Sequence, residues 1–248
     1  MIDIVKYLNL PSSTSIERKL FKKQFLDNFS LTTNEKKILS ECVDSITLNN
    51  LLNKDSINIL PFTNETHNYQ EIAVISVEIN NQSKAKEITN IILHIPYPVV
   101  LILVYKEQIQ INISPKRINI TDTAKLVVEE QYYTKWIDTN NLTEVSSEFL
   151  NSLDTLKHPF SNFKDFFISL TQSVISLNTS EISGKFKSNQ DSKFILDKIN
   201  KINLEIQELK AQIKKETNFN NKVKLNIELK NKKDRSEEHT SELQSLRG

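Results

Sequence analysis

Glu78, Ile79 and Asn80 form the segment whose residue types and spacing come closest to those of a metal-dependent enzyme. They end an apolar run. A Glu-x-Lys at the end of a buried strand, with an Asp upstream, forms the metal site of many nuclease folds, in which the carboxylates hold a divalent ion and the Lys stabilises charge. Here Asn80 takes the position of the Lys and cannot supply that charge.

Two other acidic residues could complete such a site. Asp55 is the nearby upstream Asp, and Glu71 lies at the start of the same apolar run. A nuclease that holds Mg²⁺ with Glu78 and one of these residues is therefore an alternative that the sequence leaves open. Carboxylates at strand ends are more often structural, so we expect a protein without enzymatic activity, cofactor or bound metal.

His94 is a further candidate for acid–base chemistry, because histidine changes its charge near neutral pH. It stands at the end of a predicted helix, before Ile95-Pro96-Tyr97-Pro98. A His side chain can bond the free carbonyls of a helix end, and we favour this structural role for His94.

The composition excludes several other kinds of site. The chain has two Gly, one Cys and four His in 248 residues. Two Gly cannot form a Gly-rich nucleotide loop, and a single Cys, Cys42, excludes a disulfide framework. The four His are scattered without the spacing of metal ligands.

Apolar runs and alternating patterns predict a central β-sheet. The predicted strands are residues 57–59, 72–79, 99–104, 108–113 and 125–136. Two of them, 72–79 and 99–104, are nearly continuous apolar runs, as in strands covered on both faces. Helical spacing at residues 83–93 predicts a helix between these two strands. We therefore predict an α+β fold, with a mixed β-sheet of about five strands flanked by helices.

Helices are predicted before and after this sheet. Two Thr-x-x-Glu capping boxes, which begin at Thr14 and Thr32, each predict the start of a helix. The second helix carries an apolar stripe that consists of Ile38, Leu39, Cys42 and Ile46. Apolar residues from Phe160 to Leu177 alternate gaps of three and four, which predicts a long helix packed on the sheet.

The C-terminal part of the chain has the pattern of a coiled-coil arm. Its seam, with spacings of four and three, consists of Ile195, Ile199, Ile202, Ile206, Leu209 and Ile213. Residues 218–221 interrupt this register, so they are either a stutter or the tip of a helical hairpin. Because an isolated amphipathic helix is marginal in water, the seam predicts a protein partner or a second copy of the chain.

These patterns divide the chain into four parts. We predict an α+β domain at residues 1–180, a linker at 181–190, a coiled-coil arm or helical hairpin at 191–234, and a non-native tail at 235–248. Residues 235–245 read RSEEHTSELQS, which is the translation of a common short-read sequencing adapter. Residues 185–233 contain 13 Lys, six acidic residues and no Arg. The arm could therefore follow nucleic-acid phosphates, although its interleaved acids favour a solvated helix.

Several segments, taken in order, resemble one known family. They are Leu10-Pro11-x-Ser13-Thr14, Lys23-x-Phe25, Ile57-Asn58-Ile59, residues 71–79, Ile95-Pro96-Tyr97-Pro98, Trp136 and residues 219–226. The chain resembles the prokaryotic family catalogued as domain of unknown function 4391. This resemblance implies no established activity. It implies genes that lie beside DNA methyltransferases and helicases in restriction or defence loci, and relatives that often carry Glu-x-Lys at the position of residues 78–80.

We therefore predict an accessory subunit that binds a protein partner, or itself, through the arm, within such a methyltransferase–helicase locus. The alternative is a nuclease-like or nuclease-derived DNA-binding subunit with a metal site at Glu78. The longest apolar run, Pro98 to Tyr105, is far shorter than the ~20 residues of a membrane span. With no signal peptide, we predict a cytoplasmic protein that does not bind membranes.

Overall fold

The computed structural model describes residues 4–183, 202, 205–206, 208–216 and 218–245. The chain divides into two compact units, Met1–Val174 and Ile175–Gly248. The predicted domain boundaries stay predictions. Residues 184–190 of the predicted linker lie outside the described residues, and residues 181–183 are helical.

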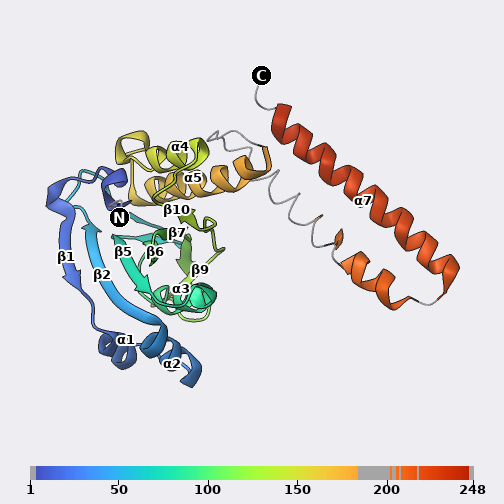
Figure 1. Ribbon diagram of the computed structural model, residues 1–248. Helices are drawn as coiled ribbons and strands as arrows, with labels where there is room; N and C mark the ends of the chain where they lie inside the picture. The colour runs from blue at the N-terminus through green and yellow to red at the C-terminus, as the bar shows by residue number, and fades with distance from the viewer. Residues whose placement is uncertain (1–3, 184–201, 203–204, 207, 217, 246–248) are drawn as a thin grey trace. The chain divides into compact units, whose positions relative to one another are not determined.

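A six-stranded mixed sheet forms the centre of the first unit (Figure 1). Its strands, in spatial order, are β1 (Ser15–Lys19), β2 (Val43–Leu52), β5 (Ile72–Ile79), β6 (Val99–Tyr105), β7 (Gln108–Ile113) and β10 (Ile137–Asp138). Neighbouring strands are antiparallel, except that β5 and β6 run parallel. A parallel pair requires a crossover, and the helix α3 (Ala85–Ile92) provides it.

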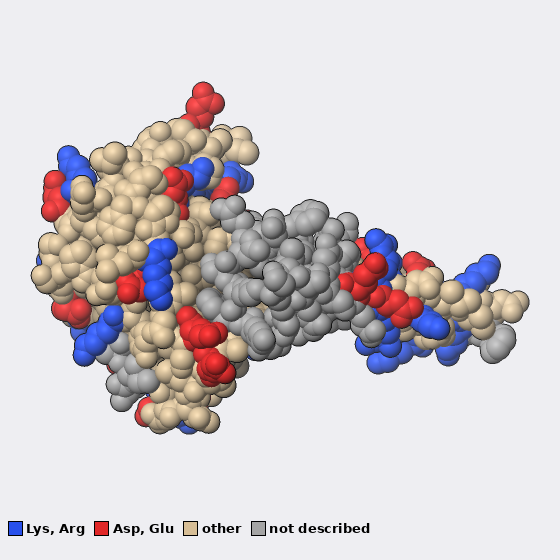
Figure 2. All heavy atoms as spheres, turned by 90° about the horizontal axis from the view of Figure 1, so that it is seen from above, with Lys and Arg blue, Asp and Glu red and all other residues tan. Residues whose placement is uncertain are grey.

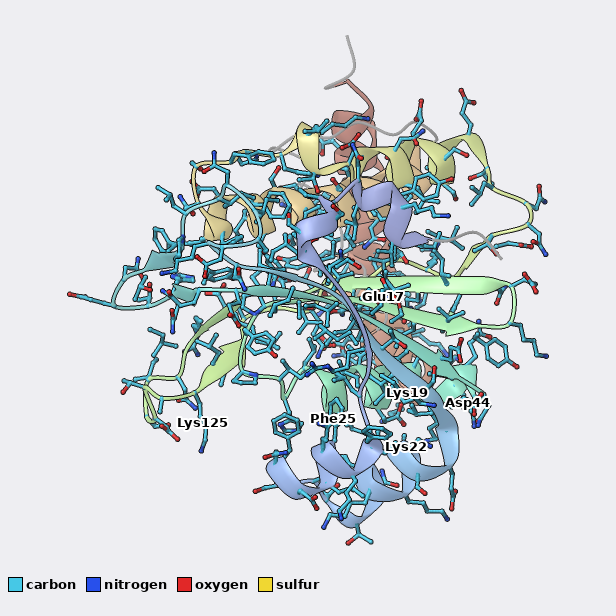
Figure 3. The ribbon with its side chains drawn as sticks, turned by 90° about the vertical axis from the view of Figure 1, so that its left-hand side faces the viewer. Glu17, Lys19, Lys22, Phe25, Asp44 and Lys125 are labelled. Carbon is cyan, nitrogen blue, oxygen red and sulfur yellow. The ribbon has the colours of Figure 1, made fainter. Side chains whose placement is uncertain are left out.

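Helices cover both faces of this sheet. Figures 1 and 3 show α1 (Lys22–Asn28) and α2 (Thr33–Cys42) on one side, and α4 (Glu144–Ser152) and the first part of α5 (Phe163–Ser183) on the other. The short elements are two hairpins, β3 (Phe62–Thr63) with β4 (Asn68–Tyr69) and β8 (Lys116–Ile118) with β9 (Leu126–Val128), and the 3-10 turns η1 (Ile4–Leu8), η2 (Ser12–Thr14), η3 (Gln82–Lys84) and η4 (Thr155–Lys157). The predicted α+β class, with a mixed sheet flanked by helices, is confirmed.

The side chains of β5 alternate between the two faces of the sheet. Ala73, Ile75, Val77 and Ile79 are buried in one apolar cluster with residues of α1, α2 and α3. Successive side chains of a strand point to opposite faces, so Glu78 lies on the face away from this cluster. Its side chain is exposed.

The prediction that a helix begins at Thr14 is wrong. Ser15–Lys19 instead form the edge strand β1, in which Glu17 has a positive φ of 46° and the pairing with β2 shifts register. This conformation is not helical, and pairing with β2 satisfies the backbone of the segment. The helix begins at Lys22, where Gln24 Oε1 accepts a hydrogen bond of 2.9 Å from the Phe21 N–H.

The second capping box is present, but its helix is shorter than predicted. Thr32 Oγ1 accepts from the Glu35 N–H at 3.3 Å, and Glu35 Oε2 accepts from the Thr32 N–H at 2.7 Å. The helix α2 ends at Cys42, and Ile46 lies in β2. Long antiparallel pairing with β5 outweighs the helical spacing of Ile46 in this region.

Two predicted strands also differ from the structure. Residues 57–59 form no strand, and Ile57 and Ile59 are buried in a loop. Within residues 125–136, the short strand β9 pairs with β8 outside the main sheet. Apolar content favours burial, but it does not determine whether a segment forms a strand or with which strand it pairs.

The second unit contains the end of α5 and the helix α7 (Phe219–Ser245). Residues 208–215 are also helical. Glu216 Oε1 accepts from the Asn218 N–H at 2.8 Å where the two helices join. Lys232 Nζ donates to Glu205 Oε2, which brings residues before and after this turn together as in a helical hairpin. The predicted coiled coil itself stays a prediction.

Candidate functional site

Glu78 lies near the C-terminal end of β5, opposite Ser45 of β2. Ser45 Oγ donates a hydrogen bond of 2.8 Å to Glu78 Oε2. This contact fixes one oxygen of the exposed carboxylate on the polar face of the sheet.

Asp44 is the functional candidate that the sequence reasoning missed. The register of β2 against β5 shifts between Val43 and Ser45, so Asp44 lies in an irregularity beside the Ser45–Glu78 pair. A bulge of this kind re-aims a side chain. The signal that could have found Asp44 is its place at the junction of a helix and a β-rich run, where we predicted continuous helix.

Asn80 connects these elements just beyond the end of β5. Its Nδ2 donates to Asp44 Oδ1 at 2.9 Å and to the carbonyl oxygen of Glu41 at 3.0 Å. Its backbone N–H donates to the carbonyl oxygen of Cys42 at 3.1 Å. Asn80 therefore orients the Asp44 carboxylate and ties the end of β5 to the end of α2.

A row of polar residues continues from this site across the same sheet face. Lys19 of β1 pairs with Thr47 of β2, two residues beyond Ser45. Thr47 in turn pairs with Ser76, whose Oγ donates to Asn49 Oδ1 at 2.8 Å. Paired residues of antiparallel strands share a face. Figure 3 shows Lys19 and Asp44 at the same end of the sheet.

Asp55 and Glu71 lie at the other end of β2 and β5. Glu71 precedes the first residue of β5, so seven residues of strand, about 23 Å, separate it from Glu78. Asp55 and Glu71 line one pocket of about 240 Å³, together with Lys54 and Tyr97. Burial, and then the charge of Glu71, raise the pKa of Tyr97. The structure thus brings two of the predicted carboxylates together, but not with Glu78.

His94 lies apart from both groups. Its ring stacks on Phe29 with centroids 5.7 Å apart, and its Nε2 lies 4.0 Å from Glu35 Oε1. The pKa of Glu35 is lowered, first by the hydrogen bonds from Thr32 and least by His94. No carboxylate of the Asp44–Glu78 site appears among these contacts of His94.

Lys116 takes the helix-capping role that we expected for His94. Its Nζ donates to the carbonyl oxygens of Leu93 at 2.8 Å and Ile95 at 2.5 Å, beyond the last turn of α3. Its backbone N–H donates to the hydroxyl of Tyr69 at 3.0 Å. Burial lowers the pKa of Lys116 to about 7 and raises the pKa of Tyr69 to about 12.

The predicted interaction seam is described in part. Ile195 and Ile199 lie outside the described residues. Ile202, Ile206 and Leu209 are 7–8% exposed. Ile213 is half-buried. Whether this seam binds a partner stays a prediction.

The described residues place limits on metal and membrane binding. Among them, no three His, Cys, Asp or Glu side chains gather closely enough to hold a metal ion by themselves. Within the same residues, none of the helices combines the length and apolar character needed to span a bilayer. The Asp44–Glu78 pair can therefore take part in metal binding only with ligands from elsewhere, such as water or a bound phosphate.

Comparison with known proteins adds one match. The model of a family described as Domain of unknown function (DUF4391) matches residues 8–235. No curated protein and no solved structure matches the chain.

Proposed function

We propose that this chain, which belongs to the DUF4391 family, is a nuclease-derived DNA-binding subunit that holds Mg²⁺ between Asp44 and Glu78. The observation that carries the proposal is the placement of both carboxylates at one end of the β2–β5 pair. Ser45 Oγ and Asn80 Nδ2 each hold one oxygen of these carboxylates. The second oxygen of each is then available to a cation.

The number of protein ligands supports a cation that binds the protein and the DNA at the same time. Mg²⁺ is usually bound by one or two carboxylates together with waters and substrate phosphates. The described residues offer two carboxylates here and no third His, Cys, Asp or Glu. A phosphate of the DNA backbone would complete the coordination, so cation and DNA should each strengthen the binding of the other.

The residue at position 80 supports binding rather than rapid cleavage. An amide cannot provide the positive charge of a Lys ammonium, and the amide of Asn80 is already bonded to Asp44 and Glu41. Lys19 is the basic residue that the strand register places on the same face. This exposed ammonium would contact a phosphate of the DNA.

Fluorescence anisotropy with a labelled DNA duplex tests the proposal on the full chain. We expect Mg²⁺ to tighten DNA binding by about fivefold or more, the coupling of typical linked sites. The variants Asp44→Asn and Glu78→Gln should lose this effect, since they keep hydrogen-bond acceptors for Asn80 and Ser45 but remove the charge. Asp27→Asn, at an exposed position on α1, is the matched control. Equal DNA binding with and without Mg²⁺ in the wild type would refute the proposal.

A second candidate function, binding of a protein partner through the C-terminal part, is favoured by one observation. Val223 and Ile227, one turn apart on α7, are 42% and 58% exposed. We propose a second copy of the chain as the partner, which light scattering of the full chain can detect. The double variant Val223→Ser and Ile227→Ser should convert a dimer into a monomer, whereas Leu60→Ser, at an exposed loop position, should not. A monomeric wild type excludes this candidate.

A further inference from the structure

A polar pocket of about 200 Å³ lies between α3 and β7, and neither Asp44 nor Glu78 lines it. Gln82, Lys86 and Thr89 line it from the side of α3, and Gln110 and Asn112 line it from β7. Gln131 and Tyr133 form the remaining side. We propose that this pocket binds a small organic oxyanion, a phosphate monoester or a carboxylate.

The strand register explains why these side chains converge. Asn112 pairs with Leu101 of β6, and Gln110 pairs with Leu103, so both share the sheet face that packs on α3. An isolated bridge places Tyr133 opposite Asn112. Because opposed residues point to the same side of a ladder, Tyr133 closes the pocket beside the other two.

Asn112 supplies the observation that calls for a ligand. Its side chain is 1% exposed, and its Nδ2 has no hydrogen-bond partner in the described part of the protein. A buried polar atom without a partner is rare and costly, and it commonly marks a water, an ion or a ligand. Since Asn112 lines the pocket, an acceptor bound inside it would be within the surroundings of this amide.

A neighbouring hydroxyl bonds the oxygen of this amide. The Tyr132 N–H donates to Ser114 Oγ at 3.3 Å, and Ser114 Oγ donates to Asn112 Oδ1 at 2.8 Å. Ser114 therefore directs its proton to the oxygen of the amide, and the NH₂ group of Asn112 is the part of the side chain without a protein partner.

Charge selects an anion among the possible acceptors. Lys86 is the charged residue of the pocket lining, and the other lining residues are neutral. Ala85 and Lys86 are also the first residues of α3, so the positive end of the helix dipole adds to the ammonium charge. The ring of Tyr133, 47% exposed, can stack on a flat part of the same ligand.

NMR of the full chain tests the proposal, with the side-chain NH₂ signals of Asn112 as the readout. The probes are inorganic phosphate, AMP, benzoate and, as the uncharged counterpart of AMP, adenosine. We expect at least one of the three anions, at about 10 mM or below, to shift these signals, with millimolar or tighter affinity. If AMP shifts these signals, it should bind more tightly than adenosine. A response to phosphate and AMP alone would assign a phosphate ligand, and a response to benzoate alone a carboxylate.

The variant Lys86→Gln distinguishes anion binding in the pocket from adventitious anion binding elsewhere on the protein. Lys86 is exposed, so its substitution should leave folding intact while it weakens anion affinity about fivefold or more, as expected for one lost charge-assisted contact. Lys37→Gln, at an exposed position on α2, should leave affinity unchanged. The proposal fails if no anion shifts the Asn112 signals, if uncharged adenosine shifts them as strongly as the most effective anion, or if Lys86→Gln leaves affinity unchanged.

Discussion

Asn80 Nδ2 donates a hydrogen bond of 2.9 Å to Asp44 Oδ1 and thereby joins the end of one strand to the start of its neighbour. The same nitrogen bonds the carbonyl oxygen of Glu41 at the end of α2. Position 80 is thus filled by a side chain that orients a carboxylate but carries no charge. This arrangement separates cation binding from catalysis in the proposed site.

Asn80→Lys should therefore introduce cleavage. If Asp44 and Glu78 hold Mg²⁺, an ammonium at position 80 supplies the missing charge for a water nucleophile, and we expect Mg²⁺-dependent nicking of plasmid DNA to rise by about 10²-fold, the usual effect of one charge-stabilising group. Gel analysis of supercoiled plasmid measures the rate. Adding Glu78→Gln to this variant should return the rate to that of the wild type. An inactive Asn80→Lys variant that binds Mg²⁺ normally would contradict this prediction.

Lys116→Met should remove a pH dependence of stability. The folded pKa of Lys116, about 7, lies below the ordinary value of 10.5. Between these values the unfolded chain binds one more proton than the folded chain, so stability rises with pH by up to ~1.4 kcal/mol per unit. Urea unfolding between about pH 7.5 and 9.5 measures this slope. The Met variant should show a flatter profile, and parallel profiles would show that Lys116 is charged in the folded protein.

Tyr69→Phe should destabilise the first unit by about 1–3 kcal/mol, the cost of leaving a buried donor without its acceptor. The hydroxyl of Tyr69 accepts the backbone N–H of Lys116, and both residues are fully buried. Thermal or urea unfolding measures the loss. Tyr105→Phe, at a half-buried position, is the matched control and should cost less. Equal stabilities of the two variants would contradict the role of this hydrogen bond.

Thr32→Ala should destabilise the first unit by about 1 kcal/mol through loss of the N-cap of α2. The backbone N–H of Thr32 and then its hydroxyl lower the pKa of Glu35 below 4.5, and Thr32→Ala removes only the hydroxyl. The stabilisation from that hydroxyl is present above pH 4.5 and is lost as pH falls through the lowered value. Unfolding near neutral and near acidic pH measures both effects. The exposed neighbour Asn34→Ala should change stability little. If Thr32→Ala lowers stability equally at both pH values, the stabilisation by the N-cap does not depend on the charge of Glu35.

Continuous apolar runs made the centre of the sheet predictable. Residues 72–79 and 99–104 are strands, with a helix between them, because strands buried on both faces need apolar residues at every position. The family resemblance is also confirmed. The junction of α2 and β2 was not predictable in this way, since Ile38, Leu39, Cys42 and Ile46 fit one helical stripe. Pairing with a strand that lies more than 20 residues away decides the state of Ile46.

The same junction explains why the candidate site was only half predictable. Glu78 was predictable because it stands near the end of a recognisable strand. Asp44 becomes its neighbour only through antiparallel pairing and a local irregularity. Asp55 is closer to Glu78 along the chain, yet the pairing of β2 with β5 carries it to the opposite end of both strands. Sequence distance therefore favoured an aspartate that does not lie at the same end of the sheet as Glu78. Asn112 carried no sequence signal, because an unpaired amide is defined only by its surroundings.

The irregular edge strand β1 has a consequence for self-association. All five of its residues are exposed, and Glu17, Arg18 and Lys19 are charged. The positive φ of Glu17 and the register shift interrupt the straight row of backbone groups that another strand would need for pairing. Edges of this kind resist addition of a foreign strand. The sheet is therefore protected from growing into an aggregate at the side where it would otherwise be open.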